Sequence, residues 1–185
     1  MEKGLSKKEL LDKIEEEAAK CERETHGCGR CTLAALMKYF ELGDEKSIDL
    51  ILKAALPLSG GIAQTRNTCG AALGGLMAIG MVFFPGKLGE ENMQDIQTAM
   101  RLGREYYRSL EKELGHIRCY DIREVGLGRC FDTSDPDEYQ KFVKAGGYEL
   151  CSRVCSKAAR LAGEYIFQIK EEQRNRKGAR PDRRT

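Results

Sequence analysis

The eight cysteines are the residues of this chain best suited to chemistry. Cys28 and Cys31 form a C-x2-C pair at the start of a predicted helix, where free backbone amides and the positive end of the helix dipole favour thiolates. Such a pair can supply half of a metal site or close a dithiol. The residue after Cys31 is Thr32 rather than His, so the pair is not a haem c attachment site.

Four more cysteines occupy positions suited to the same chemistry. Cys69 and Cys119 each lie where a loop becomes a predicted helix, and a lowered pKa is expected for the Cys69 thiol, as a nucleophile or a metal ligand requires. Cys151 and Cys155 share one face of a predicted helix, with Cβ atoms about 5–6 Å apart. An unstrained disulfide needs roughly 3.5–4.5 Å, so two ligands of one metal, or two thiols with different partners, fit better.

The remaining cysteines and the two histidines are weaker candidates. Cys21 continues an apolar helical stripe and Cys130 falls in a loop, so packing or an idle thiol is expected for each. His26 and His116 lie in predicted turns, where a solvent-facing side chain is favoured over a ligand. The chain contains no phosphate-binding glycine loop and no Ser/His/Asp set, so nucleotide-dependent and hydrolytic functions have no support.

Composition bounds the setting for this chemistry. The 185 residues suffice for one core, and 7% aromatic residues with no Trp indicate a core of Leu, Ile, Ala and Met. A net charge of +2 does not indicate nucleic-acid binding. The N-terminus lacks the apolar segment of a secretory signal, and no apolar run approaches a membrane span. We therefore expect a cytoplasmic protein, in which many cysteines indicate metal binding or thiol chemistry more than disulfide scaffolding.

Hydrophobic periodicity predicts an all-α fold, a single-domain helical bundle of about five to six main helices. The expected helical segments are residues 6–24, 28–42, 44–55, 69–80, 92–114, 119–125, 136–145 and 150–172, with a loop at 58–68 and a turn at 85–86. The segment 69–80 carries no charge, which is typical of a central buried helix. It could pack in the core or against a second subunit, so a homodimer is an open alternative.

The chain divides into a helical redox domain at residues 1–172 and a basic tail at residues 173–185. Between Arg174 and Thr185 six Lys or Arg residues face a single Asp182. A segment with so little apolar surface is expected to be disordered. The alternative is a docking arm for an acidic partner, RNA or a membrane.

The order of the cysteines resembles the redox-active family called C-GCAxxG-C-C, after its four spaced cysteines. The resemblance covers roughly residues 25–170, and its specific part is the hexapeptide from Cys69 to Gly74. The outer cysteines contribute only by their order and spacing. The matching segments begin at Cys31, Cys69, Ile117 and Cys151.

The resemblance implies a small helical redox protein, and a related domain occurs in split-Soret-type cytochromes alongside iron–sulfur chemistry. Carried over by position, it implies that the functional cysteines are Cys31, Cys69, Cys119 and Cys151. This chain departs from the plain pattern because Cys28 and Cys155 stand beside two of the four. The extra pair leaves a four-ligand cluster and a set of dithiols both open.

Three functions follow as hypotheses. The first is an iron–sulfur cluster, most simply [2Fe–2S], held by the four functional cysteines with Cys28 and Cys155 as further candidates, and used in electron transfer. The second is a thiol–disulfide protein that uses Cys28/Cys31 and Cys69 without a metal. The third is a structural zinc module. The first two require an electron-transfer or thiol-redox partner protein, and the sequence names no small-molecule substrate.

Overall fold

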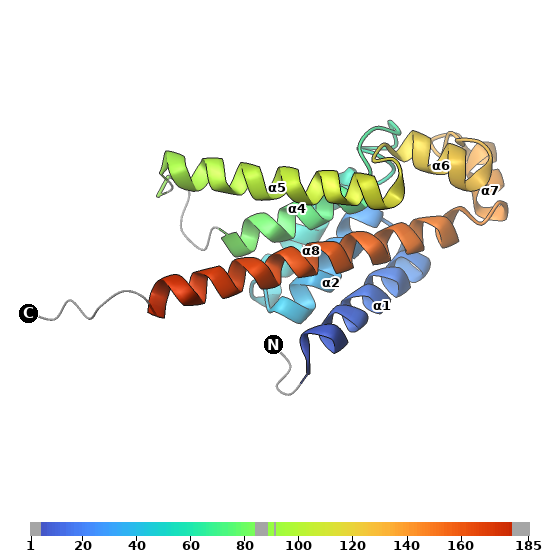
Figure 1. Ribbon diagram of the computed structural model, residues 1–185. Coiled ribbons are helices and arrows are strands. Elements are labelled where there is room, and N and C mark those ends of the chain that lie inside the picture. Colours follow the sequence, from blue (N-terminus) through green and yellow to red (C-terminus); the bar gives the residue numbers. More distant parts are fainter. Residues whose placement is uncertain (1–4, 84–88, 91, 179–185) are drawn as a thin grey trace, which may run out of the picture.

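A computed structural model describes residues 5–83, 89–90 and 92–178, with side chains as far as Asn175 (Figure 1). Within these ranges the chain is all-α, as predicted, with no strand. The helices are α1 (Lys7–Thr25), α2 (Cys28–Phe40), α3 (Glu45–Ala55), α4 (Gly70–Phe83), α5 (Met93–Leu114), α6 (Cys119–Leu127), α7 (Pro136–Lys144) and α8 (Gly147–Gly178), with a 3₁₀ turn, η1 (Leu56–Leu58), after α3. The number of helices exceeds the predicted five to six main helices because α6 and α7 are separate short helices of nine residues.

Local sequence signals set the helix starts. The Ser6 side chain accepts a hydrogen bond from the Glu9 N–H, and the Glu9 carboxylate accepts one from the Ser6 N–H, which completes a capping box at α1. The other side-chain caps are Asp44 on α3, Asn92 on α5 and Asp135 on α7. Each oxygen satisfies a backbone N–H that has no partner inside its helix.

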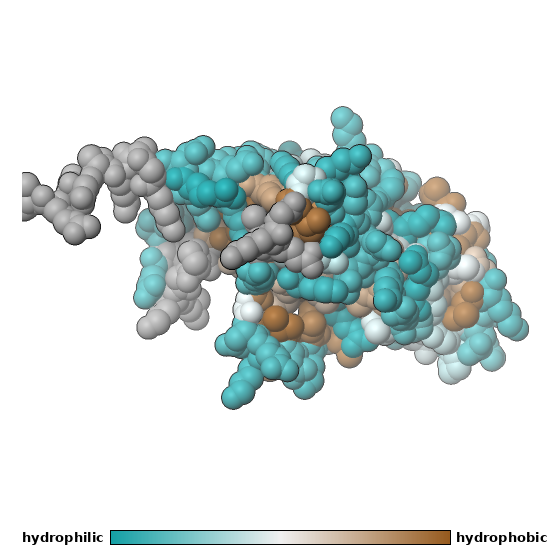
Figure 2. All heavy atoms as spheres, turned by 90° about the horizontal axis from the view of Figure 1, so that it is seen from below, coloured by the Kyte–Doolittle hydropathy of each residue, from teal (hydrophilic) through white to brown (hydrophobic). Residues whose placement is uncertain are grey.

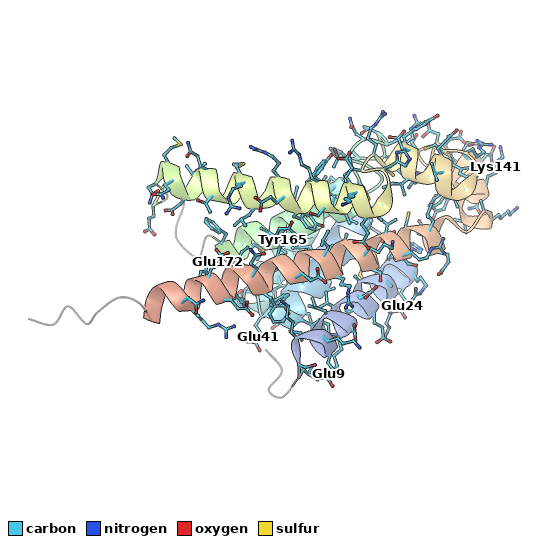
Figure 3. All side chains as sticks on the ribbon, in the orientation of Figure 1. Glu9, Glu24, Glu41, Lys141, Tyr165 and Glu172 are labelled. Atoms are coloured by element: carbon cyan, nitrogen blue, oxygen red, sulfur yellow. A yellow bond between two sulfur atoms is a disulfide. The ribbon has the colours of Figure 1, made fainter. Side chains whose placement is uncertain are left out.

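Helix α8 extends along most of the molecule, and α1 lies alongside it (Figure 1). The core between these helices and α2, α4 and α5 contains fully buried side chains that include Ile14, Leu36 and Ile166. Tyr165, labelled in Figure 3, joins α8 to α5, because its hydroxyl lies 3.1 Å from Ser109 Oγ and its ring packs edge-on against Tyr106. These contacts form one continuous core.

Helix α4 is the central apolar helix that the sequence predicts, and it packs against α2, α5 and α8 of its own chain. Its glycines permit close approach. A Cβ at Gly74 would collide with the carbonyl oxygen of Gly29 on α2, and a Cβ at Gly75 would collide with the Tyr106 hydroxyl on α5. Small residues therefore bring α2 and α4 unusually close together.

The chain ends and surface complete the fold. Helix α8 continues to Gly178, beyond the predicted boundary at residue 172, and the rest of the predicted tail and the turn at 85–86 lie outside the described residues. No described helix combines the length and apolarity needed to span a membrane. The face seen in Figure 2 is mainly hydrophilic, with small hydrophobic patches.

Candidate functional site

Three cysteines lie at the N-terminal ends of three helices. Cys28 and Cys119 are the first residues of α2 and α6, and Cys69 immediately precedes α4. The first N–H groups of a helix have no partner inside it, and the helix dipole adds partial positive charge there. These positions therefore stabilise negative charge on sulfur or on a group bound to it.

A short pairing between two loops brings Cys69 next to Cys119. Thr68 and Arg118 form an isolated antiparallel bridge. The Cys69 N–H donates to the Ile117 carbonyl at 2.9 Å, and the Cys119 N–H donates to the Asn67 carbonyl at 2.7 Å. A bridge this short has no periodicity, so sequence patterns do not indicate it.

Cysteines from four separate parts of the chain surround one cavity of about 320 Å³. The cavity lies toward the end of the molecule occupied by α6 and α7, where Lys141 is labelled in Figure 3. Its lining includes four thiols, and three of them are buried, while Cys151 is half-buried. The four are Cys28, Cys69, Cys119 and Cys151.

Cys155 lies behind this cavity instead of lining it. Its side chain is fully buried, and its thiol donates a hydrogen bond to the Cys28 carbonyl with a sulfur–oxygen distance of 3.7 Å. The i, i+4 spacing on α8 therefore places Cys151 at the cavity wall and Cys155 one turn deeper. We assign Cys155 a supporting position next to Cys28.

The glycines of the specific hexapeptide explain how Cys28 reaches Cys69. A Cβ at Gly70 would collide with both Cys28 Sγ and the Leu58 carbonyl oxygen, so only glycine leaves room for this sulfur. Gly74, one turn later, allows the α2 backbone to approach at Gly29. The hexapeptide is thus a packing motif that seats one thiol against another.

The environment of Cys28 favours its thiolate. A hydrogen bond from the Cys69 thiol is the largest cause that lowers the pKa of Cys28, to about 6, and the Gly60 N–H and the positive charge of Arg123 act in the same direction. Burial opposes the shift without cancelling it. Cys28 is therefore ionised at neutral pH in the metal-free protein.

The neighbouring thiols stay protonated. The lowered pKa expected for Cys69 from its place at a helix start is wrong, because donation of its hydrogen bond to Cys28, followed by burial, raises the pKa of Cys69 well above its usual range. Burial is the main cause that raises the pKa of Cys119 to about 11, and it also raises the pKa of Cys151. The metal-free cavity thus holds one thiolate among three thiols, and a bound cation is needed to ionise the others together.

Two buried titratable residues that the sequence analysis did not single out, Glu22 and Arg123, also line the cavity. Glu22, from the end of α1, is 3% exposed, and burial raises the pKa of its carboxyl to about 9, with a further contribution from Cys28. Arg123 on α6 is 5% exposed; its guanidinium lies over the Phe142 ring, 4.5 Å from the centroid, and donates to Thr133 Oγ1 at 3.4 Å. Both belong to helices rich in charged residues, so their sequence context resembles a solvated face.

The loop before Cys69 closes the cavity in an unusual backbone conformation. Ile62, Ala63, Gln64 and Arg66 have positive φ angles, which non-glycine residues rarely adopt. The loop is held by hydrogen bonds, among them one from the Gln64 amide to the Thr133 carbonyl at 2.9 Å. Strained backbone of this kind concentrates at functional sites.

Cys31, which the resemblance marks as functional, is not a lining residue of the cavity. Its sulfur forms a disulfide with Cys21, for which packing or an idle thiol was expected, and the two Cα atoms are 5.4 Å apart. Cys31 lies one helical turn beyond Cys28, and its sulfur is bonded to Cys21 of α1, whereas Cys28 lines the cavity. The two cysteines of the C-x2-C motif therefore have different roles: Cys28 belongs to the cavity, and Cys31 links α2 to α1.

The remaining candidates are divided between the cavity and the surface. The His26 ring stacks on Tyr148 with centroids 3.6 Å apart, and both rings line the cavity. His116 is exposed, and Cys130 is half-buried in the connection between α6 and α7. Among the described residues, no three His, Cys, Asp or Glu side chains converge on a position for a single metal ion.

Fold and site together define a class: an all-helical protein that concentrates thiols around one cavity. A family model with the description "Putative redox-active protein (C_GCAxxG_C_C)" matches residues 26–165. The chain therefore belongs to this redox-active family, as its cysteine order indicated. No curated protein and no solved structure matches the chain significantly.

Proposed function

We propose that this protein transfers electrons through an iron–sulfur cluster, most simply [2Fe–2S], held in the cavity by Cys28, Cys69, Cys119 and Cys151. The observation that carries the proposal is that thiols from four helices line one cavity, three of them at helix N-termini. When bound, such a cluster supplies one-electron chemistry at a potential set by hydrogen bonds, charge and burial. A redox partner protein would exchange electrons with it.

The four cavity thiols fit an iron–sulfur cluster better than a single metal ion. The four sulfurs are spread around the cavity wall, and they do not converge on one point. A closed tetrahedral zinc site would need all four within about 2.3 Å of the metal. The geometry therefore supports the cluster above the structural zinc module.

The surrounding residues would tune such a site. Arg123 offsets negative charge on the sulfurs, and the N–H groups of Gly29 and Gly60 point at the Cys28 sulfur. The rings of Phe142 and Tyr148 form part of the cavity wall. Cys31 takes no part as a ligand in this proposal, because its sulfur faces Cys21.

Thiol–disulfide exchange is the second candidate, and the Cys28–Cys69 pair favours it. Cys28 is the low-pKa thiol, and the Cys69 thiol donates a hydrogen bond to it, as expected for an attacking thiolate with a resolving partner. In this form the reactive pair is Cys28/Cys69, whereas the sequence pointed to Cys28/Cys31 with Cys69.

Metal and sulfide analysis of protein purified without oxygen separates these functions. We expect iron with matching acid-labile sulfide and visible absorption. Metal-free protein whose thiols titrate reversibly with two electrons would instead establish thiol exchange. Zinc alone, with melting on chelation, would establish a structural module.

A further inference from the structure

Three residues that line the cavity each carry a buried polar atom with no hydrogen-bond partner among the described residues. The atoms are Glu22 Oε2, Ser59 Oγ and Arg123 Nε. Leaving such an atom unsatisfied costs free energy, so buried polar groups nearly always have a partner. Three such atoms around one cavity indicate that a polar ligand belongs there.

Arg123 determines the sign of that ligand's charge. Its side chain is nearly fully buried, and no carboxylate lies within ion-pair distance of it among the described residues. Glu22, the acid that lines the same cavity, makes no ion pair with it. Arg123 interacts electrostatically with Glu22, with Cys130 and with the cavity cysteines Cys28, Cys119 and Cys151. A guanidinium Nε–H with its neighbouring amino group presents a planar fork that matches two oxygens of an anion.

We propose that the cavity binds a small oxyanion of the carboxylate type against Arg123 and Ser59, with Glu22 as a further hydrogen-bonding group, beside the thiols. A volume of about 320 Å³ is at the lower end of small-molecule pockets, so it has room for a small anion. If the proposed redox function holds, the protein acts on a bound small molecule and does not only carry electrons between proteins. Anion binding itself requires no cluster.

The test is a titration of the reduced, metal-free protein and of the protein as purified with sodium acetate, followed by backbone and side-chain NMR shifts at constant ionic strength. Acetamide, the uncharged analogue of the same shape, is the matched control. We expect saturable shifts at Ser59 and Arg123 with acetate, and binding of acetamide weaker by about tenfold or more, since hydrogen bonds to charged groups are stronger than those between neutral groups.

Variants locate the site. We expect Arg123→Met to weaken acetate binding at least about tenfold and Ser59→Ala to weaken it about threefold to tenfold. Arg153→Met should leave binding unchanged, because Arg153 is an exposed residue of α8 paired with Glu149. Should Arg123→Met fail to fold, Ser59→Ala and the acetamide comparison still decide the question.

Three outcomes would overturn the proposal. Equal binding by the Arg123 and Arg153 variants would indicate an adventitious ion only. Equal affinity for acetate and acetamide would remove the role of charge. Binding of acetate to the metal-free protein, but not to an iron-containing protein as purified, would show that Arg123 serves only to neutralise the redox group. Binding of acetate to a protein that contains no iron in any preparation would instead support the anion site and contradict the cluster.

Discussion

Cys28 and Glu22 face the same cavity with their pKa values displaced in opposite directions. A thiol neighbour and backbone amides stabilise the Cys28 thiolate, whereas burial without a partner disfavours the Glu22 carboxylate. The cavity therefore carries its negative charge on sulfur, and the carboxyl stays protonated at neutral pH. Each displacement has a measurable consequence.

The first prediction concerns the reactivity of Cys28. In reduced, metal-free protein, the rate of Cys28 carboxamidomethylation by iodoacetamide should rise with pH and level off with a midpoint near pH 6. Replacing Cys69 by Ala removes the largest cause of the shift, so the midpoint should move upward. Peptide mass spectrometry at each pH reads the rate, and a wild-type midpoint near 8.5, that of a free thiol, would contradict the account.

The second prediction concerns stability against pH. Because the folded-state pKa of Glu22 is raised from 4.5 to about 9, its contribution to stability is fully present below pH 4.5 and is lost as pH rises toward 9. Glu22→Gln should therefore match the wild type near pH 4.5 and exceed its free energy of unfolding by several kcal/mol at pH 8, since the wild type loses about 1.4 kcal/mol for each pH unit between the two pKa values. Denaturant unfolding of both metal-free proteins at the two pH values measures this difference in the free energy of unfolding. A difference of the same size at pH 4.5 and pH 8 would contradict the raised pKa of Glu22.

Helices position these residues, and the contact of α2 with α4 is the critical one. Gly29, Gly70 and Gly74 allow two backbones to approach so closely that the Cys28 and Cys69 sulfurs meet. The same sequence feature that weakens helix propensity in α4 thus forms the site. Stability at this contact and integrity of the site should change together.

A third prediction uses two glycines of α4. Gly74→Ala places a methyl group against the Gly29 carbonyl and should lower the free energy of unfolding by about 1–3 kcal/mol or more. Gly80→Ala meets no atom within 4 Å and should be neutral or stabilise by about 0.5–1 kcal/mol. Thermal unfolding of the two variants compares them, and equal effects would show that the helices can separate without cost.

A fourth prediction concerns the covalent link between α1 and α2. Cys21→Ser removes the disulfide to Cys31, and a loop of this size contributes about 2–3 kcal/mol. Cys130→Ser, at a half-buried and unpaired cysteine, is the control and should change stability little. In strong thiol reductant the wild type also lacks the disulfide, so Cys21→Ser and the wild type should then have the same free energy of unfolding. A lower stability of Cys21→Ser that persists in reductant would show that packing, and not the disulfide, causes the loss.

At the scale of the whole molecule, hydrophobic periodicity was sufficient to predict the positions of the helices, and the absence of charge was sufficient to predict that α4 is buried. The capping residues Ser6, Asp44 and Asn92 stand at helix starts as their side-chain chemistry indicates. Long periodic segments carry this information locally. The later end of α8 escaped prediction because its polar last turns have no apolar face.

The site was only partly predictable. The cysteine order indicated the family and the C-x2-C motif indicated paired thiols, yet which of Cys28 and Cys31 faces the cavity depends on the rotation of α2 against α1. The roles of Glu22 and Arg123 depend on tertiary burial, which neither residue type reveals. Short contacts such as the Thr68–Arg118 bridge leave no pattern in sequence.

The most direct test of the account measures iron and acid-labile sulfide in Cys28→Ser and Cys31→Ser, both purified without oxygen beside the wild type. Because Cys28 lines the cavity and Cys31 pairs with Cys21, we predict that Cys31→Ser retains the iron and sulfide of the wild type and that Cys28→Ser loses most of both. Loss from Cys31→Ser with retention by Cys28→Ser, or no iron in the wild type, would contradict the assignment of the redox centre to this cavity.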